Sequence, residues 1–204
     1  MLSDDPTRRP RLIWLTALLA VLVVGADQLT KWWALAALVD RAEPVPLIGQ
    51  AITAHLVYNP GAALSIATGM TWVLTVIVVV VVVVILRVLR RIGSRGWAVA
   101  LGLLLGGALG NLVDRLAREP GFARGHVVDF IDYFGWFVGN VADIVIVVAA
   151  GMIIVLSLVG VRLDGSRPAR HLGDAAGEDA GVGEDAGVGE DRASGSELPD
   201  GDAR

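Results

Sequence analysis

Residues 70–89 read MTWVLTVIVVVVVVVILRVL, and this stretch decides the fold. Valine fills every position from 78 to 84, which in a soluble protein would indicate a buried strand. The stretch has roughly the 20 apolar residues that a helix needs to cross a bilayer core, and arginines follow it. Because an open strand cannot satisfy its backbone hydrogen bonds in lipid, the stretch predicts a membrane-spanning helix.

Three further apolar segments of similar length predict three more spanning helices, at about residues 12–38, 97–116 and 141–163. The chain of 204 residues is 54% hydrophobic with a mean hydropathy of +0.64, too apolar for a soluble domain of this size. The first segment also resembles a cleavable signal peptide, with a basic start and small residues after its apolar part. A full span is favoured because apolar residues resume at 32–38, after the polar stretch DQLTK.

The arginines that flank these segments predict the orientation of the chain. Three arginines lie in loops 39–69 and 117–139, and ten lie on the opposite side of the predicted membrane. The ten are Arg8, Arg9, Arg11, Arg87, Arg90, Arg91, Arg95, Arg162, Arg167 and Arg170. Because cytoplasmic loops carry the excess of Lys and Arg, we expect both termini in the cytoplasm and the two loops outside.

The outer loops have structure-forming patterns of their own. The first contains two short β-rich stretches, PVPLIG and ITAHLVYN, followed by the turn signal NPG, and predicts a small sheet on the membrane surface. The second ends in the aromatic stretch DYFGWFVG, which suits a membrane interface. The predicted fold class is therefore an all-α membrane protein with four transmembrane helices, a small extracytoplasmic β-rich loop and a disordered C-terminal tail.

The charge of the chain is divided between body and tail. From residue 173 onward there are ten acidic residues and two arginines, whereas the first 172 residues have eleven acids and fifteen Lys or Arg. The tail repeats GEDAGV with almost no large apolar side chains, which predicts disorder. The expected organisation is a cytoplasmic N-terminus at 1–11, a four-helix membrane domain at 12–163 and a disordered acidic cytoplasmic tail at 164–204. The excess of Lys and Arg in the first 172 residues is small, and in a membrane protein it serves to orient the helices in the bilayer. It therefore predicts no nucleic-acid partner.

The inventory of reactive side chains narrows the possible chemistry. The chain has no cysteine, which excludes disulfides, a thiol nucleophile and thiolate metal sites. Its three histidines, His55, His126 and His171, form no HxxxH or HExxH pair, so no zinc site is predicted. Ser65 follows a loop, but no His–Asp pair accompanies it as a serine nucleophile would require. We expect no metal and no cofactor. Carboxylates are therefore the remaining candidates for reactive groups.

Ionisable residues inside spanning segments are costly and usually functional. Asp27 and Lys31 are four residues apart in the first segment and so lie on one helical face, as a structural ion pair or as support for a nearby site. Asn59 in YNPGAALS could cap a turn, although a plain loop explains this stretch equally well.

The third segment combines glycines with polar groups. Gly102, Gly106 and Gly110 form two overlapping GxxxG motifs, which let another helix pack closely. Asn111, Asp114 and Arg115 follow on one side of the predicted helix end. A structural Asp–Arg pair and a role in supporting a site both fit these last residues.

On the predicted topology, polar side chains converge at the outer ends of the segments. They are Asn111, Asp114, Arg115, Asp129, Asp132, Asn140 and Asp143. Two neighbouring carboxylates cannot both ionise cheaply, so one keeps a proton and can donate to a carbonyl oxygen while the other accepts a proton from water. That division suits amide hydrolysis. The alternatives are a divalent-cation site, the proton relay of a small transporter, or a non-catalytic scaffold that uses the glycine face. Spans that are polar only at their outer ends favour the hydrolytic site.

Five motifs, DQLTKWW, NPGAALS, GGALGNLVDRL, GHVVDFIDYF and NVADI, occur in the order seen in bacterial lipoprotein signal peptidases. The chain resembles this signal peptidase II family over about residues 12–163, which excludes the tail. The resemblance implies a four-helix aspartyl endopeptidase of the bacterial inner membrane, active at the extracytoplasmic face. It further implies that prolipoproteins are cut before a diacylglyceryl-modified cysteine of the substrate, among membrane lipids. We expect a monomer.

The resemblance also implies roles for individual residues. Asp129 and Asp143 would form the catalytic pair, with Asp132 as a neighbour of that pair. Supporting or substrate-binding roles would belong to Asp27, Lys31, Asn59, Asn111, Asp114, Arg115 and Asn140. Leu64 stands where the family more often has an aromatic residue, and Ile144 stands where it often has a small hydroxyl residue. Neither position carries a catalytic group, so these differences concern how the substrate fits.

Overall fold

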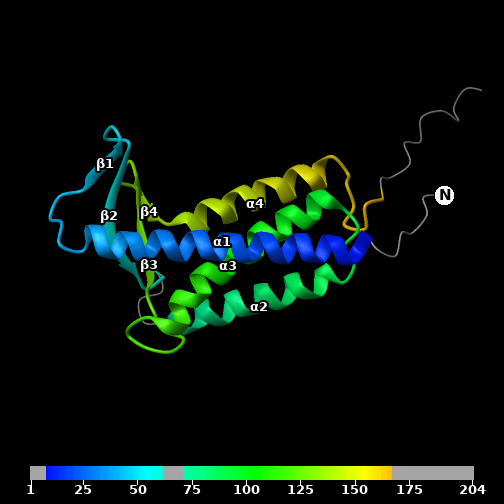
Figure 1. Cartoon of the computed structure of the whole chain (residues 1–204), viewed down its shortest axis with the longest axis horizontal. Coiled ribbons are helices and arrows are strands. Elements are labelled where there is room, and N and C mark those ends of the chain that lie inside the picture. Colours follow the sequence, from blue (N-terminus) through cyan, green and yellow to red (C-terminus); the bar gives the residue numbers. More distant parts are fainter. Residues whose placement is uncertain (1–7, 62–70, 167–204) are drawn as a thin grey trace, which may run out of the picture. The chain divides into compact units, whose positions relative to one another are not determined.

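The computed structural model describes residues 8–61 and 71–166. Four long helices and a four-stranded antiparallel sheet make up most of these residues (Figure 1). The helices are α1 (Arg8–Leu38), α2 (Thr71–Leu89), α3 (Arg95–Ala117) and α4 (Val141–Leu158). All four are long and apolar enough to cross a membrane, which confirms the predicted multi-pass membrane fold.

Some sequence predictions fall on residues outside those ranges. They concern Leu64, Ser65 and Met70, together with the acidic tail beyond residue 166 and the first seven residues.

Helix α3 occupies the centre of the helix bundle. It packs against α1, α2 and α4, and 56% of its spanning window is buried, against 28% or less in the other three. Its glycines allow this close contact, because a Cβ atom on Gly106 would lie 3.0 Å from the Cα atom of Ala20 in α1. The hydroxyl of Thr16 in α1 adds a hydrogen bond of 3.0 Å to the Ala98 carbonyl in α3. The predicted use of the GxxxG motifs in helix packing is therefore confirmed for Gly106.

The sheet joins the two long loops of the chain. Its strands pair in the order β1 (Val45–Ile48), β2 (Ile52–Asn59), β3 (Val127–Tyr133) and β4 (Phe137–Gly139). The pairing of β2 with β3 places Val57 opposite Asp129. In Figure 1 the sheet lies at the end of the bundle where α1 finishes and α4 begins.

The sequence predicted only half of this sheet. Strands β1 and β2 match the two β-rich stretches, whereas β3 and β4 were not predicted. The first four residues of β3 are all buried, so the strand shows no alternation of apolar and polar residues along its length. A run of that kind lacks the period of two from which a strand is recognised.

The end of α4 differs from the prediction. The fourth helix was expected to continue to residue 163, but it ends at Leu158, and Gly160 adopts a positive φ of 73°. The chain then folds back onto the turn between α2 and α3. The Leu163 carbonyl accepts the backbone N–H of Gly93 at 2.9 Å, and the indole of Trp97 donates to the Val161 carbonyl at 2.8 Å. The apolar residues after Leu158 therefore form a docked turn, which hydropathy cannot distinguish from one more helical turn.

Candidate active site

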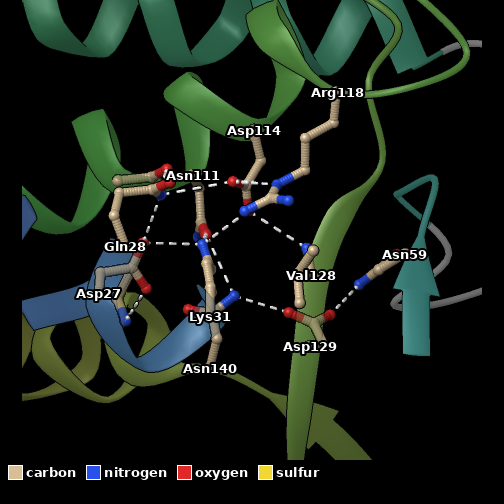
Figure 2. A network of polar contacts seen from close by, with 12 residues as sticks. Asp27, Gln28, Lys31, Asn59, Asn111, Asp114, Arg118, Val128, Asp129 and Asn140 are labelled. Carbon is tan, nitrogen blue, oxygen red and sulfur yellow. Dashed lines mark hydrogen bonds and ion pairs between the residues drawn. The ribbon is translucent and has the colours of Figure 1, made fainter. Parts of the chain in front are cut away.

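Buried polar side chains form a connected network where the helices meet the sheet (Figure 2). They come from α1, β2, α3, β3 and α4, which lie far apart in sequence. Eight of the nine residues that the motifs assign to a site are joined in it by hydrogen bonds or ion pairs: Asp27, Lys31, Asn59, Asn111, Asp114, Asp129, Asn140 and Asp143. Five of the seven residues predicted to converge at the outer ends of the segments lie in this network, whereas Arg115 and Asp132 do not.

Asp129 lies in the middle of β3 and is only 1% exposed. Each of its carboxylate oxygens accepts an amide hydrogen bond, from Asn59 Nδ2 at 2.7 Å and from Asn140 Nδ2 at 2.6 Å. Burial raises the pKa of Asp129 to about 6, and the negative charge of Asp143 acts in the same direction. The two amide donors favour the ionised form and oppose this shift. The result is a carboxyl group that can hold or release a proton near neutral pH.

Asp143 stands in the first turn of α4. Its Oδ2 atom accepts the backbone N–H of Asn140 at 3.1 Å, and its Oδ1 atom accepts Asn111 Nδ2 at 2.9 Å. Asn140 is the N-cap of this helix and belongs to a reciprocal capping box with Asp143. The side-chain amide of Asn140 donates to Asp129, and its backbone N–H donates to Asp143. Asn140 therefore contacts both carboxylates.

A second group of charges lies behind the two aspartates, between α1 and α3. The ammonium of Lys31 contacts Asp27 and Asp114, each at 2.8 Å, and all three side chains are fully buried. The predicted ion pair between Asp27 and Lys31 is confirmed, whereas the second carboxylate was not foreseen from spacing. Buried charges of this kind must be paired to be tolerated.

The predicted Asp114–Arg115 pair is not what the structure shows. Asp114 binds Lys31 and also Arg118, whose Nε atom lies 2.6 Å away. Arg115 is 8% exposed, and among the described residues its Nη1 atom has no hydrogen-bond partner. The i, i+4 position of Arg118 relative to Asp114 is a sequence signal that could have identified the true partner.

Gln28 is a network residue that sequence analysis missed. Its Nε2 atom contacts the Asp27 carboxylate at 3.1 Å, the Gly110 carbonyl at 3.1 Å and the Asp114 carboxylate at 3.3 Å. An uncharged glutamine beside a charged motif carries little signal of its own, because glutamine is common on helix surfaces.

Asp132 lies apart from this network. Its Oδ1 atom accepts the Gly135 N–H at 2.9 Å, and its Oδ2 atom lies 3.7 Å from His55 Nδ1. Within the described residues, no three His, Cys, Asp or Glu side chains converge as a group of metal ligands. Asp132 is therefore a neighbour in sequence that takes part in a local turn.

A cavity of about 370 Å³ opens beside Asp129. Asn59 and Asp129 supply polar groups, and Trp136 and Phe137 supply an aromatic wall. The other lining residues are Val57, Tyr58, Pro60 and Val138. The cavity therefore borders Asp129.

The family model described as signal peptidase (SPase) II matches residues 19–159, which include the whole network. This chain belongs to the signal peptidase II family. Membership makes it an aspartic peptidase of the membrane, in agreement with the four spanning helices and the carboxylate network. The resemblance drawn from the five motifs is confirmed.

Curated relatives support the same family. The lipoprotein signal peptidase of Rhodococcus jostii is 50% identical over 174 residues, covering 81% of this chain and 86% of the relative. That of Mycobacterium avium is 50% identical over 162 residues, covering 79% of this chain and 87% of the relative. A solved bacterial membrane enzyme matches with a TM-score of 0.61 and 28% identity, covering 70% of this chain and 87% of that one. Both the sequence and the fold of this signal peptidase II member are thus shared over most of the chain.

Proposed function

We propose that this chain removes the signal peptides of prolipoproteins, with Asp129 and Asp143 as its catalytic pair, and that it cuts before a diacylglyceryl-modified cysteine of the substrate. The observation that carries the proposal is the link through Asn140, which hydrogen-bonds to both aspartates in a largely buried site. Family membership supports the substrate class, because the curated relatives are lipoprotein signal peptidases.

In the proposed mechanism, the ionised carboxylate of Asp143 takes a proton from a water molecule as the water oxygen attacks the scissile carbonyl carbon. The protonated carboxyl of Asp129 donates a hydrogen bond to the carbonyl oxygen, where negative charge develops. When the C–N bond breaks, the leaving amine nitrogen receives the proton held by Asp143. The net reaction is the addition of one water molecule across the peptide bond, and both aspartates return to their starting protonation states.

The assignment of the proton to Asp129 has a physical basis. Burial and the charge of Asp143 raise the pKa of Asp129 to about 6, so it retains a proton more readily than an ordinary aspartate. Asp143 lies in the first turn of α4, where the positive end of the helix dipole and two N–H donors stabilise a carboxylate. The raised pKa of Asp129 therefore suits it to the role of the acid, which leaves the role of the base to Asp143.

The proposed orientation puts the sheet and the site at the extracytoplasmic face and both termini in the cytoplasm. Four described arginines near the turn between α2 and α3 support it, because they lie at the end of the bundle opposite the sheet: Arg87, Arg90, Arg91 and Arg95. We further propose that the domain spans residues 12–163 and works as a monomer.

The lipid of the substrate would lie in the bilayer beside the helices. Lipid-facing side chains are abundant there, as in α2, where Ile77 and Val80 are more than half exposed. Each CH₂ group of a buried acyl chain contributes about 0.8 kcal/mol to membrane binding, so the acyl chains help to retain the precursor at the site. The cavity lined by Trp136 and Phe137 would take peptide residues next to the scissile bond.

The test compares cleavage of a diacylglyceryl-modified precursor with cleavage of its unmodified form, by the natural chain and by the variants Asp129→Asn and Asp143→Asn. Asp132→Asn is the matched control, because Asp132 lies outside the network. We expect loss of cleavage in the first two variants, normal cleavage in the control, and strong preference for the modified precursor. Normal cleavage by a correctly inserted Asp129 or Asp143 variant would remove that residue from the pair, and equal cleavage of both precursors would refute the dependence on lipid.

A further inference from the structure

Two backbone N–H groups next to the proposed catalytic residues are held in the same way. The N–H of Val128, which precedes Asp129, donates to the Asp114 carboxylate at 3.2 Å. The N–H of Ala142, which precedes Asp143, donates to the Asp27 carboxylate at 3.0 Å. Val128 and Ala142 are both fully buried, so these N–H groups need a protein partner. Each proposed catalytic aspartate is thus preceded by a residue that a buried carboxylate holds in place.

Lys31 connects the two carboxylates. Its Nζ atom lies 2.8 Å from Asp27 Oδ2 and 2.8 Å from Asp114 Oδ2, and it donates to Asn111 Oδ1 at 2.9 Å. An ammonium group has three donors, and these three acceptors use all of them. Lys31 is fully buried, so water does not compete for these positions.

The third contact of Lys31 sets the direction of an amide. Asn111 Oδ1 accepts from Lys31 and from Asn140 Nδ2, which leaves the Nδ2 group of Asn111 to donate to Asp143. If the amide were reversed, its NH₂ group would face two donors and its oxygen would face a carboxylate. Lys31 therefore favours the one orientation of Asn111 in which Asp143 receives a hydrogen bond.

Gly110 supplies the space in which Asp27 makes these contacts. A Cβ atom at this position would lie 2.6 Å from Asp27 Oδ2. The third glycine of the predicted GxxxG series thus accommodates a carboxylate, whereas Gly106 accommodates the Val23 side chain and the Ala20 Cα atom of α1. The glycines of α3 therefore make room both for the close packing of α1 and for the buried carboxylate of Asp27.

We propose that Lys31 is the positioning residue of the catalytic pair: through Asp114 it fixes β3 at Asp129, and through Asp27 and Asn111 it fixes the start of α4 at Asp143. This inference rests on the proposed function, since it requires Asp129 and Asp143 to be the reacting groups. Strand and helix come from different parts of the chain, and one ammonium group ties both to the bundle. Lys31 makes no described hydrogen bond or ion pair with either aspartate, so its positioning effect passes through the residues that it holds. Its positive charge also acts directly on Asp129, where it lowers the pKa.

The first test is Lys31→Met, which retains a long side chain and removes the three donors. Turnover per folded molecule at the optimal pH should fall about 100-fold, because small displacements of catalytic groups have effects of that size. The Michaelis constant for the modified precursor should stay within about threefold of the natural value, because the substrate contacts are untouched. Folded protein is measured by thermal unfolding in detergent, so that loss of fold and loss of turnover are separated.

Two further variants keep the proposal testable if Lys31→Met does not fold. Gln28→Leu removes the amide that contacts Asp27 and Asp114 and keeps every charge, at a half-buried position, and should lower turnover about tenfold. Lys31→Arg keeps the charge, but a planar guanidinium does not match acceptors arranged around an ammonium, so turnover should stay low. Natural turnover in folded Lys31→Arg would show that charge alone matters and would overturn the positioning role, as would natural turnover in Gln28→Leu.

Thr16→Val is the matched structural control. Thr16 is buried in α1 at the same contact with α3, and the change removes its hydrogen bond to Ala98. This variant should unfold at a lower temperature with unchanged turnover per folded molecule. Asp129→Asn and Asp143→Asn are measured alongside. Normal cleavage by either one refutes the catalytic pair itself, whereas inactive aspartate variants together with normal turnover in folded Lys31→Met refute only the role of Lys31.

Discussion

Asn140 and Asp143 hold each other at the start of α4. The Oδ1 atom of Asn140 accepts the backbone N–H of Asp143 at 3.1 Å, and the Oδ2 atom of Asp143 accepts the backbone N–H of Asn140 at 3.1 Å. This reciprocal cap uses only the oxygen of the Asn140 amide, so its NH₂ group is left to reach Asp129 at 2.6 Å. One residue therefore both begins a membrane helix and connects the two carboxylates of the proposed site.

Asn140→Ser separates these two roles. Serine can still accept the Asp143 N–H as an N-cap, but it has no amide to donate to Asp129. We expect thermal stability close to that of the natural chain and turnover reduced about 10- to 100-fold. Asn140→Ala should in addition lose about 1 kcal/mol of stability, because the cap is lost. Equal turnover in Asn140→Ser and the natural chain would contradict a linking role for the amide.

The pH dependence of cleavage should depend on Asn59. The amide of Asn59 stabilises the ionised form of Asp129 and so lowers its pKa. In the natural chain, activity should fall as the pH rises through about 6, because Asp129 then loses the proton that it donates. In Asn59→Leu the pKa of Asp129 is higher, so the fall should occur at higher pH. The measurement is the initial rate of cleavage across the pH range, and a shift to lower pH would contradict the assignment.

Asp129 should also give the folded protein a measurable pH dependence of stability. Its pKa rises from 3.8 in the unfolded chain to about 6 in the fold, so the unfolded chain loses its proton first as the pH rises. The stability contributed by the protonated group is complete below about pH 4 and is lost as the pH rises through about 6, a change of up to about 3 kcal/mol.

Asp129→Asn isolates this contribution, because an amide does not titrate. Any pH-independent effect of placing an amide among the Asn59 and Asn140 donors changes stability equally at every pH. The difference in unfolding temperature between the variant and the natural chain should therefore shift in favour of the variant between pH 4 and pH 7. A constant difference across that range would argue against a raised pKa.

A pair of glycines tests the contact between α1 and α3. In Gly106→Ala the new Cβ atom would lie 3.0 Å from the Cα atom of Ala20, so the helices must separate and stability should fall by about 1–3 kcal/mol. Gly25→Ala is the matched control in α1, because nothing lies within 4 Å of its Cβ position. Its stability should stay within about 1 kcal/mol of the natural value. Thermal unfolding of both variants in the same detergent provides the comparison.

The sequence predicted the four helices well because lipid imposes a strong and simple pattern. About 20 apolar residues are needed for each span, and only helices satisfy their own backbone there. The end of α4 was placed wrongly because Val159, Val161 and Leu163 extend the apolar pattern of the helix, and the docking of Trp97 and Leu163 is a tertiary contact. Strand β3 was missed for a related reason, since its burial on both faces removes the alternation that indicates a strand.

The candidate site could be predicted as a set of residues but not as a set of contacts. Spacing alone gave the pair Asp27 and Lys31, because i, i+4 residues share a helical face. The same rule applied to Asp114 leads to Arg118, whereas the adjacent Arg115 was considered as its partner. The contact of Lys31 with Asp114 joins residues that lie far apart in sequence and on different helices, so only the packing of α1 on α3 reveals it.

The order of the chain gives the network a consequence for biosynthesis. Asp27, Asn59, Asn111 and Asp129 are all synthesised before Asn140 and Asp143, which begin the last helix. A nascent chain that has inserted only its first three helices has neither the second carboxylate nor the amide that connects the pair. If Asp129 and Asp143 are the catalytic pair, as proposed, the pair is complete only once α4 has joined the other three described helices.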